Sequence, residues 1–403
     1  MRILVAGGAG YIGSHAVREC SRLGHEPVIF DNYSSGNPQA VDGLELVSGD
    51  LLDPRSLRSV FETFAIDAVL QLASAYRAPA NLDNPVHYYR NNVAGTLNLV
   101  HAMLSAGVER LVYLSTAAVY GLPAEVPIPE QHECRPITTH GRSQRMIEEM
   151  LAEIAKQQGL RHVTLRCFTA AGADQAGDIG EDRRDALQLI PSLLLAALGR
   201  RKKFSIFGTD YDTPDGTCIR DFVHVSDVAR ALLLALDRTD TCAGRVFNLG
   251  GGEGYSVREV LQEAQQLFGA SIAIEVLGRR SGDVPVQVAA CDAAREALDW
   301  TPRESDLRNI LETAWAWHRR HPSGYGSAAP SDTAQSDQNT KLFGDIACRL
   351  GYVSQEDVQR ALERQEREMQ LGNQHKLIGM HMLEMGMLSI SQLIEILKYY
   401  EER

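Results

Sequence analysis

A glycine-rich turn near the amino terminus constrains the fold of this chain most strongly. The apolar segment 2–6 is typical of a β-strand and leads into the spacing Gly7-x-x-Gly10-x-x-Gly13, after which the residues to Cys20 have a helical pattern. Glycines at these positions permit a tight turn, a close approach of the backbone to a pyrophosphate and close helix–strand packing. The helix N-terminus then directs amide groups at phosphate oxygens. The turn therefore predicts a dinucleotide site.

A second apolar segment, 27–30, strengthens this prediction because it ends at a carboxylate. Asp31 follows it directly. In dinucleotide-binding folds, an acidic residue at about this distance from the glycines bonds the ribose hydroxyls of the adenosine. A glycine-rich turn beside a surface aspartate is the alternative, but the strand–turn–helix context argues against it.

Further strands alternate with helices along the first part of the chain. Strands are expected at 44–47, 66–72, 110–115 and 162–168, and helices at 91–105 and 141–158. This alternation predicts an α/β fold with a doubly wound parallel sheet, whose ligands lie beyond the carboxyl ends of the strands. We assign a Rossmann domain to residues 1–168. Longer loops around helices at 190–198 and 257–268 then predict a smaller domain over 169–321, interleaved with the first.

The remainder of the chain divides into a linker and an internal repeat. Residues 322–340 are rich in Ser, Ala, Gln, Asp and Gly, which is typical of a flexible linker. In residues 341–403, Gly351-Tyr352-Val353-Ser354 recurs as Gly386-Met387-Leu388-Ser389. Each copy predicts a helix, a glycine turn, a capping serine and a second helix, so a small all-α domain is expected.

Composition excludes several classes of function. The chain has 403 residues and a net charge of −12, which argues against a general DNA or RNA surface. It has no apolar run of the length of a membrane span, and its first strand begins at residue 2, so no secretory leader is expected. Its seven scattered cysteines fit a reduced cytoplasm and no metal site.

Residues 1–326 resemble UDP-glucose 4-epimerases, which are extended short-chain dehydrogenase/reductases. The matching motifs are Gly7 to Ser14, Asp31-Asn32, Gly49-Asp50, Asn91-Asn92-Val93-x-Gly95-Thr96, Ala117 to Gly121, Gly177-Asp178-x-Gly180-Glu181-Asp182, Arg220-Asp221-Phe222-x-His224-Val225 and Arg279-Arg280-x-Gly282-Asp283. The resemblance implies tightly held NAD and a UDP-hexose substrate. It also implies a homodimer that pairs through segments 92–105 and 141–158.

The resemblance assigns site residues position by position. The implied NAD-binding residues are Gly7, Gly10, Tyr11, Ile12, Gly13, Asp31, Asn32, Asp50, Leu51, Ala73, Asn92 and Ser115. The implied UDP-sugar residues are Thr169, Gln188, Arg220, Arg280 and Asp283. Thr169 stands in place of a family Asn, and Gln188 is interpreted as the replacement for a second one.

The catalytic pair departs from the family pattern. The family uses Tyr-x-x-x-Lys on one helix, in which the tyrosine accepts the proton of the sugar hydroxyl and the lysine lowers the tyrosine pKa. Here the corresponding residues are His140 and Gln144, whereas Thr116 keeps the assisting Ser/Thr position. A neutral glutamine supplies no positive charge. We therefore expect an NAD- and UDP-sugar-binding protein of weak or absent epimerase activity, a sensor or scaffold.

The alternative is an active epimerase with changed chemistry. A histidine is a competent base near neutral pH, so His140 is one candidate for proton transfer. Tyr76, at a family Lys position near the nicotinamide, is the other.

Residues 341–403 resemble the N-terminal domain of type II secretion ATPases. Some of those domains bind cyclic di-GMP through an Arg-Leu-Gly start in each repeat. The corresponding triplets here are Leu342-Phe343-Gly344 and Leu377-Ile378-Gly379, which lack the arginine and argue against nucleotide binding. A module that binds a protein partner is expected instead.

Overall fold

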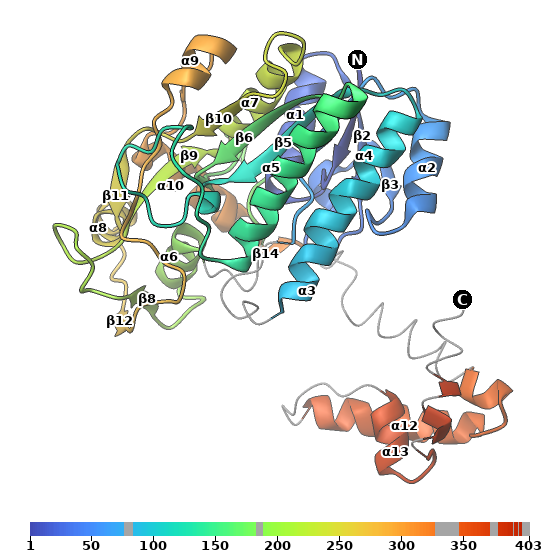
Figure 1. Ribbon diagram of the computed structural model, residues 1–403. Coiled ribbons are helices and arrows are strands. Elements are labelled where there is room, and N and C mark those ends of the chain that lie inside the picture. Colours follow the sequence, from blue (N-terminus) through green and yellow to red (C-terminus); the bar gives the residue numbers. More distant parts are fainter. Residues whose placement is uncertain are drawn as a thin grey trace. The chain divides into compact units, whose positions relative to one another are not determined.

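The computed structural model describes residues 1–75, 84–182, 188–326, 346–370, 378–389, 391–393 and 395–396. The chain forms two compact units, Met1–Ser327 and Ala328–Arg403. Figure 1 shows the first as a sheet flanked by helices and the second as a group of helices. The predicted Tyr76 alternative lies outside the described residues.

A seven-stranded parallel sheet forms the centre of the first unit, in the order β10-β6-β5-β4-β1-β2-β3. Its strands are β1 (Arg2–Ala6), β2 (Glu26–Asp31), β3 (Glu45–Ser48), β4 (Ala68–Gln71), β5 (Arg110–Thr116), β6 (Arg161–Cys167) and β10 (Val246–Leu249). Strand order reverses between β1 and β4, where doubly wound sheets open a crevice for ligands. The predicted Rossmann-type α/β fold is confirmed.

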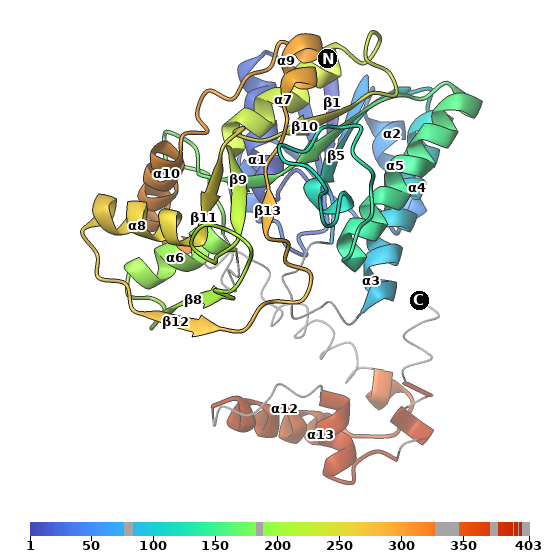
Figure 2. The ribbon, with the colours of Figure 1, turned by 60° about the vertical axis from the view of Figure 1, so that its left-hand side comes forward.

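Helices cover both faces of this sheet, as Figure 2 shows. They are α1 (Tyr11–Arg22) and α7 (Val225–Asp237) on one face, with α2 (Pro54–Thr63), α4 (Gly95–Ser105) and α5 (Thr139–Gln158) on the other. Successive strand residues point to opposite faces. Accordingly, Ile3 and Val5 pack in the core beneath α1 and α7, whereas Leu4 and Ala6 pack beneath the other three helices. Burial on both faces explains why these strands read as continuous apolar runs.

Helix α4 is the last part of a longer helical segment. Its preceding turns are α3 (Pro85–Tyr88) and a π-helical stretch, Tyr89–Ala94. The predicted helix at 91–105 therefore starts inside the π-helical turn.

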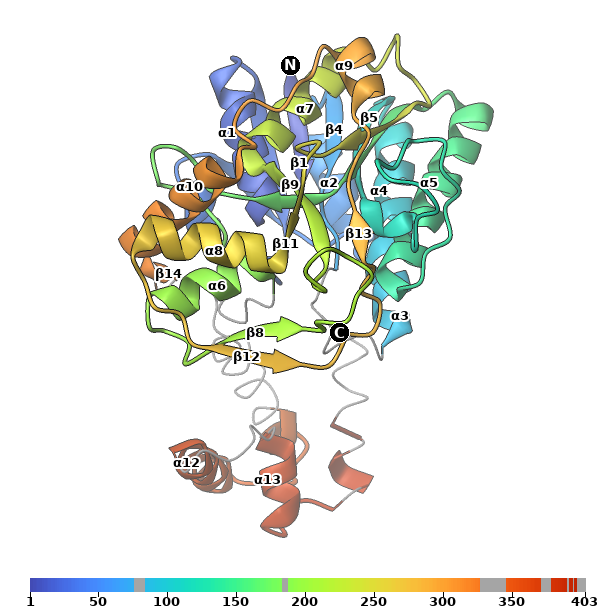
Figure 3. The same cartoon turned by 90° about the vertical axis from the view of Figure 1, so that its left-hand side faces the viewer.

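A smaller lobe lies beside the carboxyl ends of the strands and contains two short sheets (Figure 3). Its elements are β7 (Thr169–Ala171), α6 (Leu189–Ala197), β8 (Phe204–Phe207), β9 (Ile219–His224), β11 (Gly254–Ser256), α8 (Val257–Phe268), β12 (Ile274–Leu277), β13 (Val286–Gln287), α10 (Leu307–Arg320) and β14 (Pro322–Tyr325). Helix α9 (Asp292–Leu298) instead packs with α7 and β10 in the core of the large sheet. Helices α6, α8 and α10 share one apolar core with β8 and β9. The chain crosses into this lobe and returns to the large sheet through β10.

In the second unit, helices lie next to the two predicted glycine turns. Helix α12 (Gln355–Gln370) follows Gly351, and α13 (Ile378–Glu384) precedes Gly386; both glycines have positive φ. The Ser354 hydroxyl accepts a hydrogen bond from the Asp357 amide at 3.1 Å, and Ser389 accepts from the Gln392 amide at 3.3 Å. The predicted capping role of both serines is thus confirmed.

Candidate active site

The glycine turn forms a closely packed wall between β1 and α1. Gly7 has φ +79°, and a Cβ there would lie 2.7 Å from the backbone nitrogen of Ala73. At Gly13 a Cβ would lie 2.1 Å from the Gly7 carbonyl oxygen. The first turn of α1 therefore sits directly on the strand end. The first amide groups of a helix lack acceptors within it, so this end can receive an anion.

Asp31 lies at the end of β2 with its carboxylate held in place by the backbone. It accepts hydrogen bonds from the amides of Ala9 at 3.0 Å and Tyr33 at 2.8 Å. Burial raises the pKa of this carboxyl. Beside it, the Asn32 side chain donates to Asp50 at 2.9 Å. Both acids keep acceptor positions for hydroxyl groups, since a carboxylate has about four lone-pair sites.

A single cavity of about 570 Å³ joins this wall to the smaller lobe. It brings together most of the residues predicted from the sequence: Gly7, Gly10, Tyr11, Ile12, Gly13, Asp31, Asn32, Asp50, Leu51, Ala73, Ser115, Thr116, His140, Gln144, Thr169, Gln188, Arg220 and Asp283. Asn92 and Arg280 are not among its lining residues. The Asn92 amide instead donates to the Ser143 hydroxyl at 3.0 Å and accepts from the Ala75 amide at 2.7 Å.

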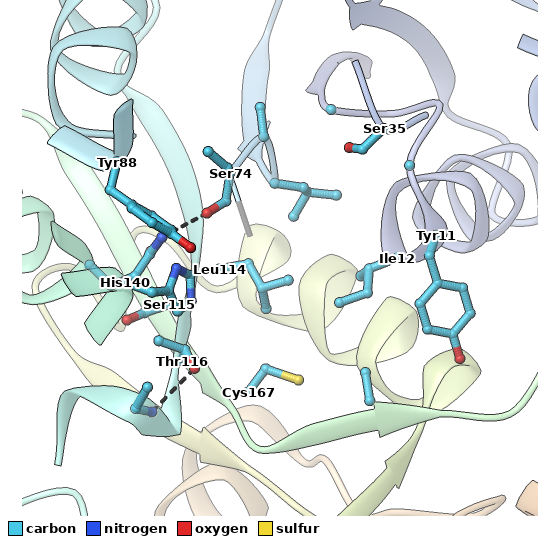
Figure 4. Close-up of a pocket in the computed structure, with 18 of the residues that line it drawn as sticks. Tyr11, Ile12, Ser35, Ser74, Tyr88, Leu114, Ser115, Thr116, His140 and Cys167 are labelled. Carbon is cyan, nitrogen blue, oxygen red and sulfur yellow. Dashed lines mark hydrogen bonds between the residues drawn. The ribbon is translucent and has the colours of Figure 1, made fainter. Parts of the chain in front are cut away.

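The first turn of α5 presents His140 to the cavity. Thr138 caps the helix by accepting from the Gly141 amide at 3.1 Å. A Cβ on Gly141 would lie 2.4 Å from the Ala118 carbonyl oxygen, so only glycine lets α5 approach the turn after β5 this closely. Figure 4 shows the resulting group of His140, Thr116 and Tyr88. The rings of His140 and Tyr88 are 6.3 Å apart.

Burial dominates the electrostatics of His140, whose pKa it lowers to about 4. A buried imidazolium would lose its hydration, so the neutral ring is favoured. At neutral pH the side chain is therefore uncharged and has a nitrogen able to accept a proton.

Gln144 lies one turn further along α5 and is 2% exposed. Its carbonyl oxygen accepts a hydrogen bond from the Tyr113 hydroxyl, and its amide nitrogen donates to the Ser74 hydroxyl at 2.8 Å. Tyr113 lies on β5, and Ser74 follows β4. The glutamine thus links a residue in the core with a hydroxyl in the cavity wall.

A buried ion pair lies behind this group. Glu148 of α5 and Arg166 of β6 form two hydrogen bonds, at 2.7 and 3.0 Å. Ser115, which lines the cavity, donates to the same carboxylate at 2.6 Å. Arg166 also donates to the Tyr120 hydroxyl at 3.0 Å. This network holds the ends of β5 and β6 against α5.

The opposite end of the cavity carries a cation and a carboxylate. Arg220 donates to the carbonyl oxygens of Ile219 at 2.9 Å and Val284 at 2.8 Å, and it lies 3.6 Å from the Asp283 carboxylate. The Arg280 guanidinium lies over the ring of Phe207, 3.5 Å from its centroid.

The chain resembles characterised proteins over about four fifths of its length. The description "NAD dependent epimerase/dehydratase family" matches residues 3–250. The chain belongs to this family. It is 42% identical over 329 residues to the UDP-glucose 4-epimerase of Halalkalibacterium halodurans, covering 81% of this chain and 98% of that protein. It is 43% identical over 336 residues to that of Azospirillum brasilense, covering 83% and 97%.

Solved structures of the family have the same fold. The UDP-glucose 4-epimerase of Brucella ovis, in complex with NAD, is 40% identical with a TM-score of 0.75, covering 78% of this chain and 97% of its own. That of Bifidobacterium longum, in complex with NAD⁺ and UDP, is 31% identical with a TM-score of 0.77, covering 80% and 100%. About a fifth of this chain thus has no counterpart in these relatives.

Several residues in or behind the cavity wall were not predicted from the sequence, among them Ser74, Tyr88, Tyr113 and Glu181. Glu181 belongs to a family-like motif, and a tyrosine amid a core strand needs a hydrogen-bond partner, which was a usable indication for Tyr113. Nothing local distinguishes Ser74 or Tyr88.

The described part of the chain contains no cluster of three or more His, Cys, Asp or Glu side chains suited to a metal ion. None of its helices is both long and apolar enough to cross a membrane.

Proposed function

We propose that this chain is an NAD-dependent nucleotide-sugar 4-epimerase in which His140 accepts and returns the proton of the sugar hydroxyl. The observation that carries the proposal is the position of His140 in the wall of a cavity that also contains the glycine turn and Arg220. Its pKa, lowered to about 4 by burial, favours the neutral ring at neutral pH. The relatives named above are UDP-glucose 4-epimerases, which supports this active alternative over a purely binding role.

The residues of the cavity fit NAD. The amide groups at the N-terminus of α1 would hold the pyrophosphate. The glycines make this possible because a side chain at Gly7 or Gly13 would collide with backbone and push α1 away from the strand end. The Asp31 carboxylate would accept hydrogen bonds from the adenosine ribose. Bound NAD supplies the reversible oxidation of the sugar alcohol.

The other end of the cavity suits a uridine diphosphate group. A guanidinium matches phosphate oxygens through paired hydrogen bonds, and Arg220 lies in the wall there. Among the structural neighbours, the Bifidobacterium longum enzyme is described with UDP and a Thermotoga maritima enzyme with UDP-glucose. We propose a UDP-hexose as the substrate.

The role of His140 follows from proton balance. When the sugar carbonyl forms, the hydroxyl proton moves to the neutral imidazole, and it returns when the alcohol re-forms. Thr116 lies in the same wall and would share that hydroxyl through a hydrogen bond. A base whose pKa is lowered to about 4 accepts a proton less readily than a phenolate does, so modest turnover is expected.

The test is interconversion of UDP-galactose and UDP-glucose by the purified full chain, followed by chromatography. His140→Ala should reduce turnover by roughly 10²–10⁴-fold, the usual contribution of a positioned base. Retained turnover in that variant would exclude His140 as the base and direct attention to Tyr76.

A second candidate function is ligand binding with little turnover, as a sensor or scaffold. The observation that favours it is the uncharged Gln144, whose amide is already bonded to Tyr113 and Ser74. The same assay separates the two: no product with saturating NAD and UDP-galactose, together with measurable binding of both, supports this candidate. The double change His140→Tyr with Gln144→Lys should then raise turnover.

We also propose that the first unit forms a homodimer through α4 and α5. Leu97 and Met146 are each 46% exposed on these helices. Light scattering should give a dimer mass, and Leu97→Glu should give a monomer. Independently of the dimer, we propose that the second unit binds a protein partner through its two repeats.

A further inference from the structure

The side chains of Tyr113, Gln144 and Ser74 form one continuous hydrogen-bonded row from the core to the cavity. The Tyr113 hydroxyl donates to the Gln144 carbonyl oxygen, and the Gln144 amide donates to the Ser74 hydroxyl at 2.8 Å. Tyr113 is 2% exposed and does not line the cavity, whereas Gln144, also 2% exposed, and Ser74 both line it. The row therefore has one buried end and one end that a ligand can reach.

The direction of this row is fixed by its buried end. Among the described residues, the bond to Gln144 is the only hydrogen bond of the Tyr113 hydroxyl. A buried hydroxyl hydrogen needs an acceptor, and only the carbonyl side of the glutamine amide can provide one. If the amide were reversed, the phenol hydrogen would be left without an acceptor. Tyr113 thus decides which way the Gln144 amide faces.

The orientation of Ser74 follows from that of Gln144. Its hydroxyl oxygen accepts from the Gln144 amide, and in the described part of the chain it donates to no other residue. A hydroxyl that accepts one hydrogen bond retains its own hydrogen for donation. Since Ser74 lines the cavity, that hydrogen is available to an oxygen atom of a ligand.

We propose that Tyr113 is a positioning residue that orients Gln144 and, through it, makes Ser74 a hydrogen-bond donor to a hydroxyl oxygen of the bound nucleotides. Gln144, the middle residue of the row, stands at the position where the family pattern has a lysine. It replaces charge with a directed chain of neutral bonds. This inference rests on the proposed function for the identity of the ligand, but the orientation of Gln144 does not depend on it.

The first experiment uses the full chain without ligand. Glutamine side chains are labelled with ¹⁵N, and the Gln144 amide signals are identified by their loss in Gln144→Leu. Tyr113→Phe should shift these signals and speed their hydrogen exchange with solvent, because the amide loses its fixed partner. Tyr255→Phe is the matched control, since it removes a phenol that donates to the exposed Glu253 at 2.7 Å outside the cavity. Unchanged Gln144 signals in Tyr113→Phe would overturn the proposal.

The second experiment measures NAD and UDP-galactose binding separately by calorimetry. Ser74→Ala and Tyr113→Phe should each weaken one of these ligands by about five- to tenfold, the effect of one neutral hydrogen bond. The double variant should bind that ligand as tightly as whichever single variant binds it less tightly. The two losses should not add, because both changes break the same row. The ligand that responds identifies the hydroxyl as that of a ribose of NAD or of the UDP-sugar.

The outcomes separate this inference from the proposed function. Additive losses, or normal affinity for both ligands in Ser74→Ala, would overturn the recognition role of the row while the proposed function stands. A wild-type chain that binds neither ligand would overturn the proposed function and the recognition role together. Circular dichroism confirms that each variant is folded.

Discussion

At the scale of single residues, the candidate site depends on close approaches that only particular side chains permit. The glycines of the first turn bring backbone to backbone, and Gly141 brings α5 to the turn after β5. The partial burial of His140 lowers its pKa to about 4, which favours the neutral imidazole at neutral pH. These are local features with measurable consequences.

Gly13→Ala should abolish NAD retention. Its Cβ would lie 2.1 Å from the Gly7 carbonyl oxygen, so the helix must move away from the strand, at a cost of about 1–3 kcal/mol in stability. Mass spectrometry of the denatured protein and thermal unfolding measure the two effects. Gly278→Ala is the matched control, because a Cβ there meets nothing within 4 Å. Equal NAD content in both variants would contradict the assignment.

His140 should make the folded state sensitive to acid. Its pKa is about 4 when folded and about 6.5 when unfolded, so the unfolded chain binds the extra proton between these values. Stability contributed by the neutral ring is full above pH 6.5 and falls as the pH drops toward 4. The free energy of unfolding of the wild type minus that of His140→Gln should therefore decrease from pH 6.5 to 4.5. Parallel curves in urea unfolding would disprove this account.

At the scale of elements, α5 is held to the sheet by both apolar and ionic contacts. Ile147 and Leu151 pack in the core with β1 and β4 residues, and Glu148 pairs with Arg166 of β6. A buried pair of this kind contributes geometry more than stability, because desolvation offsets much of its attraction.

Arg166→Met should destabilise the protein by less than about 3–5 kcal/mol, the cost of a fully unpaired buried charge. It removes the buried partner of the Glu148 carboxylate and leaves the partly exposed Arg145, 3.1 Å away, as its counter-ion. The double variant Arg166→Met with Glu148→Leu removes both charges and should recover part of this loss. Urea unfolding compares the two. A double variant less stable than Arg166→Met alone would argue against charge burial as the cause.

At the scale of the whole molecule, the chain consists of two units joined by a polar segment. The predicted linker, 322–340, is wrong at its start, because Pro322–Tyr325 form β14 and the Tyr325 hydroxyl accepts a hydrogen bond from the Gly180 amide at 2.9 Å. Limited proteolysis should cut within the remaining residues 327–340, since they have the composition of a flexible linker. Two fragments should remain, with NAD on the larger one and helical circular dichroism in the smaller one. Rapid degradation of the smaller fragment would refute its independent folding.

Much of the fold could be predicted because it depends on patterns of residues that lie close together in the sequence. The glycine turn, the alternation of strands and helices, Asp31 at the end of β2 and the capping serines of the repeats all depend on residues close together in the chain. Parallel strands follow from the intervening helices, and their carboxyl ends share one edge, so most of the cavity wall could be predicted as well.

What the sequence by itself determined is therefore the dinucleotide-binding α/β fold, the helical repeat and the residue types at the site. Only the tertiary structure decided how those residues are oriented and joined. Gln144 bonds Tyr113, 31 residues away, and Ser74, 70 residues away, from two other elements. Periodicity indicates which face of an element is buried, but it does not indicate which distant side chain will come within hydrogen-bond distance. That pairing depends on the packing of α5 against β5 and on the course of the chain after β4, which are properties of the folded chain.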